Sequence, residues 1–349
     1  TTIIKCIIEI FEKLGKSVLL MAPTGRAARR MEQSTGRPSM TVHKLLGLFA
    51  GDDGAFDGAD EIDAAYNDFE NEEKRKEIEA FAETEDIDPK MLGEFISEYE
   101  FLSNNSSQFF GSTMSPHSTF INENSFSLAK QLSDNYHSVF IHPYKRISYN
   151  RPYAFECLGF NEQFYDKDLR EKFNKEGYYT DAGLYEIIQQ MTDTSEENLF
   201  VFTVTVQNHS PYTLMDELDI PQLETGYGEL ADKYFSELKQ SDIAFKSLIE
   251  YYSNSDEPTI IVMFGDHQAK LDSEFFEAVD GRPLKELLSD PEQKLFKTPF
   301  VIWANYPIDE KDGLNISINY LSTLMLEQTG LPKTEYQYFL TQIMNKLPV

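Results

Sequence analysis

The chain has 349 residues, a formal net charge of −28 and 41% hydrophobic residues. This composition excludes collagen, a coiled coil and wholesale disorder, and the length allows two or three domains. The longest apolar runs, such as residues 199–206, are far shorter than the roughly 20 residues of a membrane helix, so we expect no membrane span and no export signal. Cys6 and Cys157 are too few and too far apart for a disulfide framework or a CxxC metal site.

The charge is distributed unevenly along the chain. Residues 1–50 carry a net charge of +5, residues 51–108 carry −15, and the remaining residues carry −18. Steps of this size indicate segments with different origins or partners. The charge pattern therefore predicts three segments. Together with the motifs described below, it places them at residues 1–50, 51–118 and 119–349.

The first segment has the order helix, strand, turn, helix. Apolar residues recur at helical spacing over residues 2–14, residues 17–21 predict a short buried strand, and residues 22–28 form the turn that follows. The sequence APTGRAA at this turn, together with TVHKLL at residues 41–46, resembles the ATPase core of RecD-type superfamily 1 DNA helicases. This resemblance covers residues 1–49 and implies that the turn contacts single-stranded DNA near the nucleotide.

The parts that hydrolyse a nucleotide are missing from this segment. Hydrolysis needs a glycine-rich phosphate loop with its lysine, and an acidic residue that binds magnesium. Arg26, Arg29 and Arg30 could contact a phosphate backbone, or they could form a solvated helix face. We therefore predict a helicase-like ATPase fragment, with nucleic acid as a partner only if this segment is functional.

The middle segment is acidic and contains few apolar residues at its start. Residues 51–67 are rich in Gly, Asp and Ala, which predicts a linker, and residues 72–82 and 89–101 predict two amphipathic helices. Residues 70–102 are weakly similar to a helical element of type I restriction endonuclease motor subunits, which implies helix packing or subunit contact. Residues 102–118 are polar and predict a second junction.

From about residue 120 onward, predicted strands alternate with predicted helices. We expect strands at residues 138–142, 199–206, 259–264 and 299–303, and helices at residues 125–132, 180–191, 227–252 and 318–329. This alternation predicts an α/β fold with a mainly parallel sheet covered by helices.

Polar residues follow three of these strands, where ligands bind in open α/β sheets. Asp266 and His267 follow one strand, and a carboxylate beside an imidazole suits a divalent cation. His209 follows a second strand, and His142 with Arg151 follows a third, which suits an anion. Each residue alone is often structural, but together they predict a site for an anion and a metal.

Longer motifs around these residues carry a closer resemblance. The sequences HPYKRISYNRPY, FTVTVQNHSPY and IVMFGDHQA resemble the sulfatase-type domain of lipoteichoic acid synthase-like proteins, in the alkaline phosphatase superfamily. The resemblance covers the C-terminal two-thirds of that domain, so the fold is expected to be N-terminally incomplete. It implies that Asp266 and His267 bind Mn²⁺ or Mg²⁺, that His209 and Arg151 hold a phosphate or phosphoglycerol group, and that His142 lines the site.

The family's chemistry runs through a metal-bound threonine that forms a covalent phosphoryl intermediate. That threonine and a metal-binding glutamate belong to the part of the domain before residue 125, and no matching motif stands in residues 111–124. Thr113 and Thr119 lack the family context, so the catalytic residue is unknown. Loss of the first strands would also leave an open sheet edge, which predicts a tendency to aggregate.

Two classes of function follow from the sequence. The first is a metal-dependent phosphoglycerol transferase or sulfatase-type enzyme, impaired by the missing nucleophile. Its substrate would carry phosphoglycerol or sulfate, such as a membrane lipid headgroup, and the parent domain would act on the extracellular face of a membrane. The alternative is a non-catalytic mosaic protein that binds anions or nucleic acid, or a fragment of a RecD-type helicase.

Overall fold

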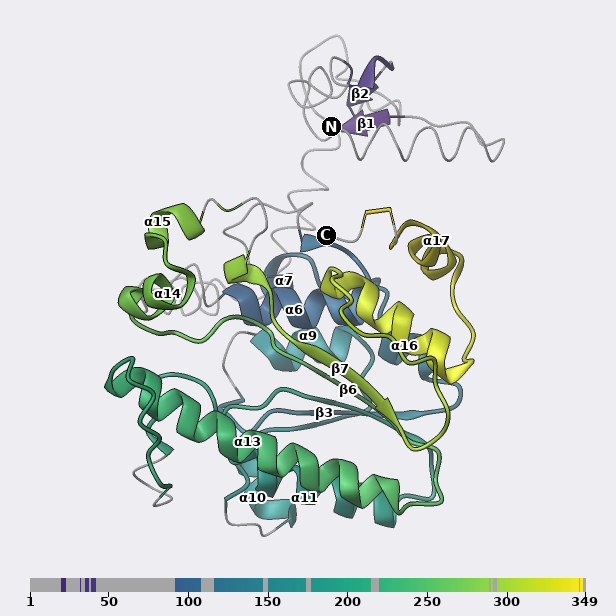
Figure 1. The fold of residues 1–349 in the computed structure, drawn as a ribbon. Coiled ribbons are helices and arrows are strands. Elements are labelled where there is room, and N and C mark those ends of the chain that lie inside the picture. Colours follow the sequence, from purple (N-terminus) through teal and green to yellow (C-terminus); the bar gives the residue numbers. More distant parts are fainter. Residues whose placement is uncertain are drawn as a thin grey trace, which may run out of the picture. The chain divides into compact units, whose positions relative to one another are not determined.

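The chain divides into two compact units, residues 1–86 and residues 87–349 (Figure 1). The computed structural model describes residues 20–22, 32, 35–37, 39–41, 92–107, 116–146, 150–173, 177–214, 220–288, 290, 294–344 and 346–347. The helices predicted at residues 2–14 and 72–82 and the linker predicted at residues 51–67 lie outside this described part.

The described part of the first unit contains a pair of short parallel strands. β1 (Leu20–Ala22) pairs with β2 (Ser39–Thr41), with Leu20 opposite Ser39. β1 overlaps the end of the strand predicted at residues 17–21, which is the apolar run SVLLM.

The second unit contains five described strands in two sheets. β3 (His137–Ile141) lies between β4 (Glu162–Phe164) and β5 (Leu199–Thr203), and all three are parallel. β6 (Ile260–Phe264) pairs with β7 (Phe300–Ala304) in an antiparallel ladder. The mainly parallel sheet predicted from the sequence is therefore confirmed, with β7 as the antiparallel strand.

Helices cover both faces of the strands (Figure 1). One face carries α10 (Asp166–Phe173), α11 (Asp181–Thr194) and α13 (Glu229–Ser253). The opposite face carries α6 (Leu92–Ser103), α7 (Pro116–Thr119), α9 (Arg151–Cys157) and α16 (Leu321–Thr329). The remaining helices are α8 (Leu128–Leu132), α14 (Ser273–Asp280), α15 (Leu284–Leu287), α17 (Glu335–Met344) and the 3₁₀ turns η4 (Lys294–Phe296) and η5 (Ile318–Tyr320).

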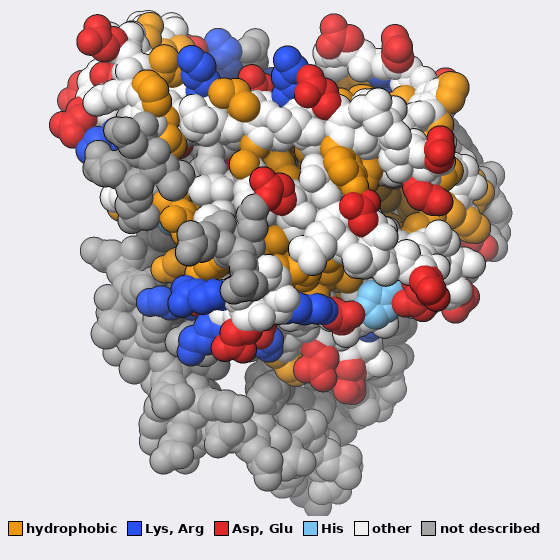
Figure 2. All heavy atoms as spheres, turned by 90° about the horizontal axis from the view of Figure 1, so that it is seen from below, with side chains coloured by type: hydrophobic (Ala, Val, Ile, Leu, Met, Phe, Trp, Pro, Cys, Tyr) orange, Lys and Arg blue, Asp and Glu red, His pale blue; other side chains and the backbone are white. Residues whose placement is uncertain are grey.

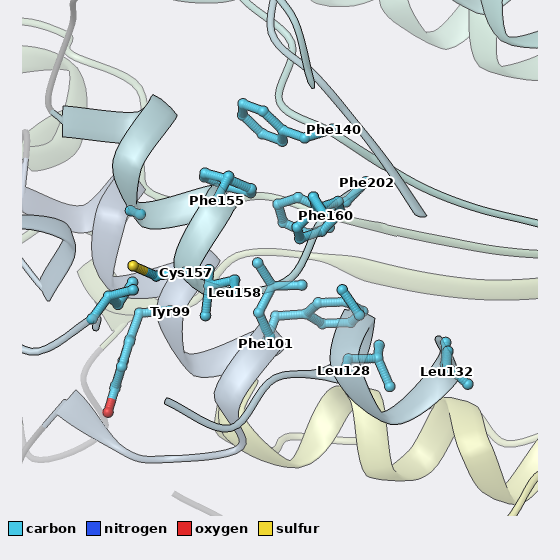
Figure 3. Packing of buried hydrophobic residues seen from close by; sticks show 14 of the residues in the cluster. Tyr99, Phe101, Leu128, Leu132, Phe140, Phe155, Cys157, Leu158, Phe160 and Phe202 are labelled. Carbon is cyan, nitrogen blue, oxygen red and sulfur yellow. The ribbon is translucent and has the colours of Figure 1, made fainter. Parts of the chain in front are cut away.

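Side chains alternate in direction along β3, so neighbouring residues of this strand belong to two different hydrophobic cores. Val139 and Ile141 point to the face of α10 and α11, whereas Phe140 points to the face of α6 and α9. On that second face Phe140 stacks on Phe155 with ring centroids 3.6 Å apart (Figure 3). Full burial of such a side chain contributes about 1.5–3 kcal/mol, so both cores anchor the central strand.

Helix α6 belongs to the core of the second unit. Tyr99, Phe101 and Leu102 are buried in the same cluster as Phe140 (Figure 3). At the end of α6, Asn104 donates from Nδ2 to the backbone oxygen of Asn319 at 2.9 Å. This helix therefore packs as an integral layer of the second unit, although its sequence stands among acidic residues.

The surface of the second unit carries many acidic side chains. Asp and Glu are spread over the face shown in Figure 2, with apolar side chains visible between them.

Of the helices that the structure describes, none combines the length and the apolar character needed to cross a bilayer.

Candidate anion and metal site

Polar residues gather at the carboxyl ends of β3, β5 and β6, in two different environments. A cavity of about 1790 Å³ is lined by His209, Asp266 and His267, together with Ser97 and Glu98 of α6. Of the residues predicted for the site, the structure thus brings His209, Asp266 and His267 to one cavity. His142 and Arg151 do not line it, and lie instead in a buried cluster.

The turn after β6 brings its backbone very close to the segment that precedes β7. A Cβ added at Gly265 would lie 3.0 Å from the Cβ of Thr298, so a larger residue forces a shift there. The Thr298 hydroxyl donates to the Gly265 oxygen at 2.7 Å, and the Gly265 amide donates to the Pro299 oxygen at 3.0 Å. These contacts set the position of the next two residues, Asp266 and His267.

Asp266 and His267 are held by one hydrogen bond from α6 and one within their own turn. The Ser97 hydroxyl of α6 donates to the backbone oxygen of Asp266 at 2.7 Å, and Oδ1 of Asp266 accepts from the amide of His267 at 2.9 Å. Oδ2 of Asp266 lies 3.8 Å from Nε2 of His267, and both side chains are partly exposed. A cation between these two atoms could be reached by both side chains.

The ring orientation of His267 suits metal binding. Its Nδ1 lies 2.8 Å from the backbone oxygen of Gln268, and because a carbonyl can only accept, Nδ1 carries the proton. In the neutral ring the lone pair is then on Nε2, which faces Asp266. Histidines that bind metals commonly donate their other ring nitrogen to a carbonyl or carboxylate in this way.

His209 has the same tautomer for the same reason. Its Nδ1 lies 2.7 Å from the backbone oxygen of Ser210, so Nδ1 donates and Nε2 has the lone pair in the neutral ring. The side chain is exposed at the cavity wall. When the ring is protonated, both nitrogens become donors, and Nε2 can then bind an anionic oxygen.

A buried tyrosine joins the loops that follow β5 and β6. The Tyr212 hydroxyl donates to the Lys270 oxygen at 3.3 Å and accepts from the Lys270 amide at 2.9 Å. Burial raises the pKa of Tyr212 to about 12. This link joins the loop that carries His209 to the loop that carries Asp266.

The buried cluster at the end of β3 is centred on Arg151. The guanidinium donates to Glu98 of α6, from NH2 to Oε1 at 2.6 Å and from Nε to Oε2 at 3.4 Å. Nε2 of His117 lies 3.3 Å from Oε2 of Glu98. The side chains of Arg151 and Glu98 are 1% and 3% exposed, so this is an ion pair removed from water.

His142 completes this cluster through both ring nitrogens. Nδ1 lies 3.0 Å from the Val204 oxygen of the chain after β5, so Nδ1 donates. Nε2 then accepts from NH1 of Arg151 at 3.1 Å in the neutral ring. His142 therefore links the ends of β3 and β5 to the arginine.

Sequence reasoning did not single out Glu98, His117 or Ser97. One signal was available for Glu98, because it stands three residues after Phe95 and four before Leu102, on the apolar side of an amphipathic helix. A carboxylate at such a position must find a buried partner. His117 shows no comparable signal in the sequence.

The described residues offer part of a metal ligand set. In the portion of the chain that the structure describes, no three His, Cys, Asp or Glu side chains are grouped to hold a metal ion. Asp266 and His267 would therefore supply two coordination positions of the metal that the resemblance implies.

This arrangement of helix-covered strands with polar loops at their carboxyl ends has the fold of the alkaline phosphatase superfamily. The structure is similar to phosphoglycerol transferase GacH of Streptococcus pyogenes, solved in complex with sn-glycerol-1-phosphate, with a TM-score of 0.58 and 21% identity over 72% of this chain and 66% of that one. It is also similar to the lipoteichoic acid synthase LtaP of Listeria monocytogenes, with a TM-score of 0.53 and 15% identity over 68% and 60%.

The sulfatase family matches residues 96–331, so the chain belongs to the sulfatase family. A Rhizobium meliloti protein named for cyclic beta-1,2-glucan modification is 27% identical over 259 residues, which are 70% of this chain and 40% of that protein. The capsular polysaccharide biosynthesis protein RkpI of the same organism is 32% identical over 143 residues, or 38% of this chain and 24% of RkpI. The chain thus matches less than half the length of each of these relatives.

The first segment matches a different class of protein. An AAA domain matches residues 1–105, and 47 residues are 51% identical to the ATP-dependent RecD2 DNA helicase of Deinococcus radiodurans, covering 14% of this chain and 7% of the helicase. These matches confirm the mosaic of helicase-like and sulfatase-like sequence. The similarity of residues 70–102 to restriction motor subunits stays a prediction.

Proposed function

We propose that the sulfatase-like unit binds a phosphoglycerol- or sulfate-bearing group at the cavity end formed by His209, Asp266 and His267. The observation that carries this proposal is the convergence of these three side chains on one cavity, from loops that follow two different strands. The similarity to GacH, a phosphoglycerol transferase solved in complex with sn-glycerol-1-phosphate, supports phosphoglycerol as the substrate class.

Each residue has a defined part in this proposal. Asp266 and His267 bind a divalent cation, Mn²⁺ or Mg²⁺, which when bound would neutralise charge on a phosphoryl oxygen. His209 orients the anionic group through Nε2. Arg151 binds the anion only by exchanging its bond to Glu98, and His142 keeps the guanidinium in place during that exchange.

Weak metal binding and impaired turnover follow from the same ligand set. Selectivity and affinity of a metal site depend on ligand number and geometry, and two protein ligands are fewer than a stable site has. The catalytic residue is unassigned, because no motif of the family's nucleophilic threonine stands in residues 111–124. The proposed source of the phosphoglycerol group is a membrane lipid headgroup on the extracellular face.

Calorimetric titration with MnCl₂ tests the metal site directly. Stoichiometric binding by the full chain that disappears in Asp266→Ala supports the proposal. The matched control is Asp256→Ala, an exposed aspartate outside the cavity, which is expected to bind as the parent chain does. Absence of binding in the parent chain, or equal binding in the Asp266→Ala variant, would show that these residues hold no metal.

A second candidate function rests on the RecD2 match and on the net charge of +5 over residues 1–50. We propose that this first segment binds single-stranded DNA through Arg26, Arg29 and Arg30. Fluorescence anisotropy with a labelled oligonucleotide is expected to show binding that weakens with salt. Unchanged binding after all three arginines are replaced by glutamine would refute the assignment.

A further inference from the structure

The cavity of about 1790 Å³ extends far beyond the polar residues at its end. It runs along every residue of β5 and β6, and we call this part, between those two strands, the slot. Pockets for small ligands measure roughly 300–1,000 Å³, so the volume of the whole cavity is larger than such a ligand needs. Among the described strands, β5 pairs only with β3 and β6 pairs only with β7, which leaves one edge of each along the slot.

The backbone of β5 has hydrogen-bonding groups directed toward the slot. The Asn198 oxygen accepts from His137 and the Val204 amide donates to Ile141, so even-numbered residues of β5 pair with β3. Since backbone groups alternate in direction along a strand, those of Leu199, Val201 and Thr203 are directed away from β3.

The same alternation holds for β6. The Gly265 amide donates to the Pro299 oxygen, and the Thr259 oxygen accepts from Asn305, so odd-numbered residues pair with β7. The backbone groups of Ile260, Val262 and Phe264 are therefore directed away from β7. Both strands offer a row of alternate amide and carbonyl groups along the slot.

A single aromatic ring bridges the two strands on one face of the slot. Phe101 of α6 stacks on Phe202 of β5 at 5.7 Å and on Phe264 of β6 at 5.1 Å, measured between ring centroids. β5 and β6 are therefore held beside each other by a shared helix, although they do not pair with each other.

The faces above and below the slot are apolar. Phe101 and Met325 line it from the face of α6 and α16, and Ile188 and Leu248 line it from the face of α11 and α13. An occupant must therefore present apolar side chains to both faces and hydrogen-bonding groups to both edges. An extended peptide of β-branched residues has this pattern, with side chains alternating between faces and backbone groups directed to the neighbours.

We propose that the slot between β5 and β6 binds an extended apolar polypeptide segment of another chain, which joins the two sheets by strand addition. Main-chain hydrogen bonds to both edges provide the affinity, and the two apolar faces select alternate side chains. The added strand converts two small sheets into one continuous sheet. This inference does not depend on the metal or on the phosphoglycerol site.

Hydrogen exchange at single amides, followed by NMR on the full chain, tests this inference. The probe is the peptide Lys-Val-Ile-Val-Thr-Val-Lys. Exchange at Val201 and Val262, whose amides are directed to the slot, is expected to slow at least tenfold at saturation. The adjacent amides of Phe202 and Met263, which pair with β3 and β7, serve as internal controls and are expected to change little.

A matched peptide with alternate amides N-methylated keeps every side chain but loses half of its donors. We expect it to bind at least tenfold more weakly than the parent peptide in fluorescence anisotropy. Equal binding of the two peptides, or no slowing at Val201 and Val262, would overturn the proposal. The proposal would also be overturned if the amides of Val201 and Val262 already exchanged as slowly as that of Phe202 in the free protein. The same holds if decanoate slowed exchange at these two amides and the peptide had no effect.

Discussion

Two groups of polar residues lie at the same edge of the sheet and differ in almost every physical respect. The cluster of Glu98 and Arg151 is closed to solvent, with side chains 3% and 1% exposed and bonded to one another, although Glu98 also borders the cavity. The group of His209, Asp266 and His267 lines an open cavity, and Asp266 and His267 are 40% and 28% exposed. Position at the carboxyl end of a strand therefore does not by itself define a binding residue, because burial and pairing decide what remains accessible to a ligand.

The largest effect is expected from Arg151→Met in the closed cluster. Removing the arginine leaves the buried Glu98 carboxylate without its ion-pair partner, which costs about 3–5 kcal/mol of unfolding free energy. Urea denaturation measures this loss. The double variant Glu98→Leu with Arg151→Met is the control and is expected to regain most of it, because no charge remains buried. A loss below about 1 kcal/mol in the single variant would mean that water reaches the cluster.

A smaller effect is expected at the turn that carries the open group. Gly265→Ala places a Cβ 3.0 Å from the Cβ of Thr298, and overpacking of this kind costs about 1–3 kcal/mol. Because Asp266 follows directly, Mn²⁺ affinity is expected to fall as well. Thermal unfolding and calorimetry measure the two effects, and an unchanged stability would show that Thr298 moves aside without cost.

Tyr212→Phe tests the link between the two loops of the open group. Loss of the hydroxyl bonds to Lys270 is expected to cost about 1 kcal/mol. The pKa of Tyr212 is raised to about 12 in the folded state, so this phenol contributes stability that is complete below its ordinary pKa of about 10. That contribution is lost as the pH rises from about 10 through 12, and the Phe variant is expected to lack this component of alkaline destabilisation.

The smallest effect on stability is expected from His209→Ala. The side chain is exposed, so the free energy of unfolding is expected to change by less than about 0.5 kcal/mol. Affinity for glycerol 1-phosphate, measured by calorimetry, is expected to decrease in the same variant. A large loss of stability here would place His209 with the closed cluster and remove the contrast between the two groups.

Most strands and long helices were predictable because each is a local apolar pattern. The runs at residues 199–206 and 259–264 became β5 and β6, although the observed strands are one to three residues shorter. β4 was not predicted, since Glu162–Phe164 has three residues and two of them are polar. α10 was missed for a related reason, because Leu169 is its only buried residue.

The candidate site was predictable in its residue types but only partly in its arrangement. Asp266, His267 and His209 were predicted from their positions after strands, and the structure brings them to one cavity. The pair of Arg151 and Glu98 joins residues 53 positions apart, and no spacing in one sequence reveals such a partner. Whether Arg151 holds a substrate anion stays a prediction.

The ion pair between α6 and α9 also limits where this sequence can be recombined. The helicase-like and sulfatase-like matches overlap at residues 96–105, within and just after α6. A crossover before Leu92 keeps the whole helix with the sheet that it covers. A truncated chain starting at residue 119 would expose the pocket of Phe101 and leave Arg151 without its carboxylate, so a gene fusion that joins there would encode an insoluble product.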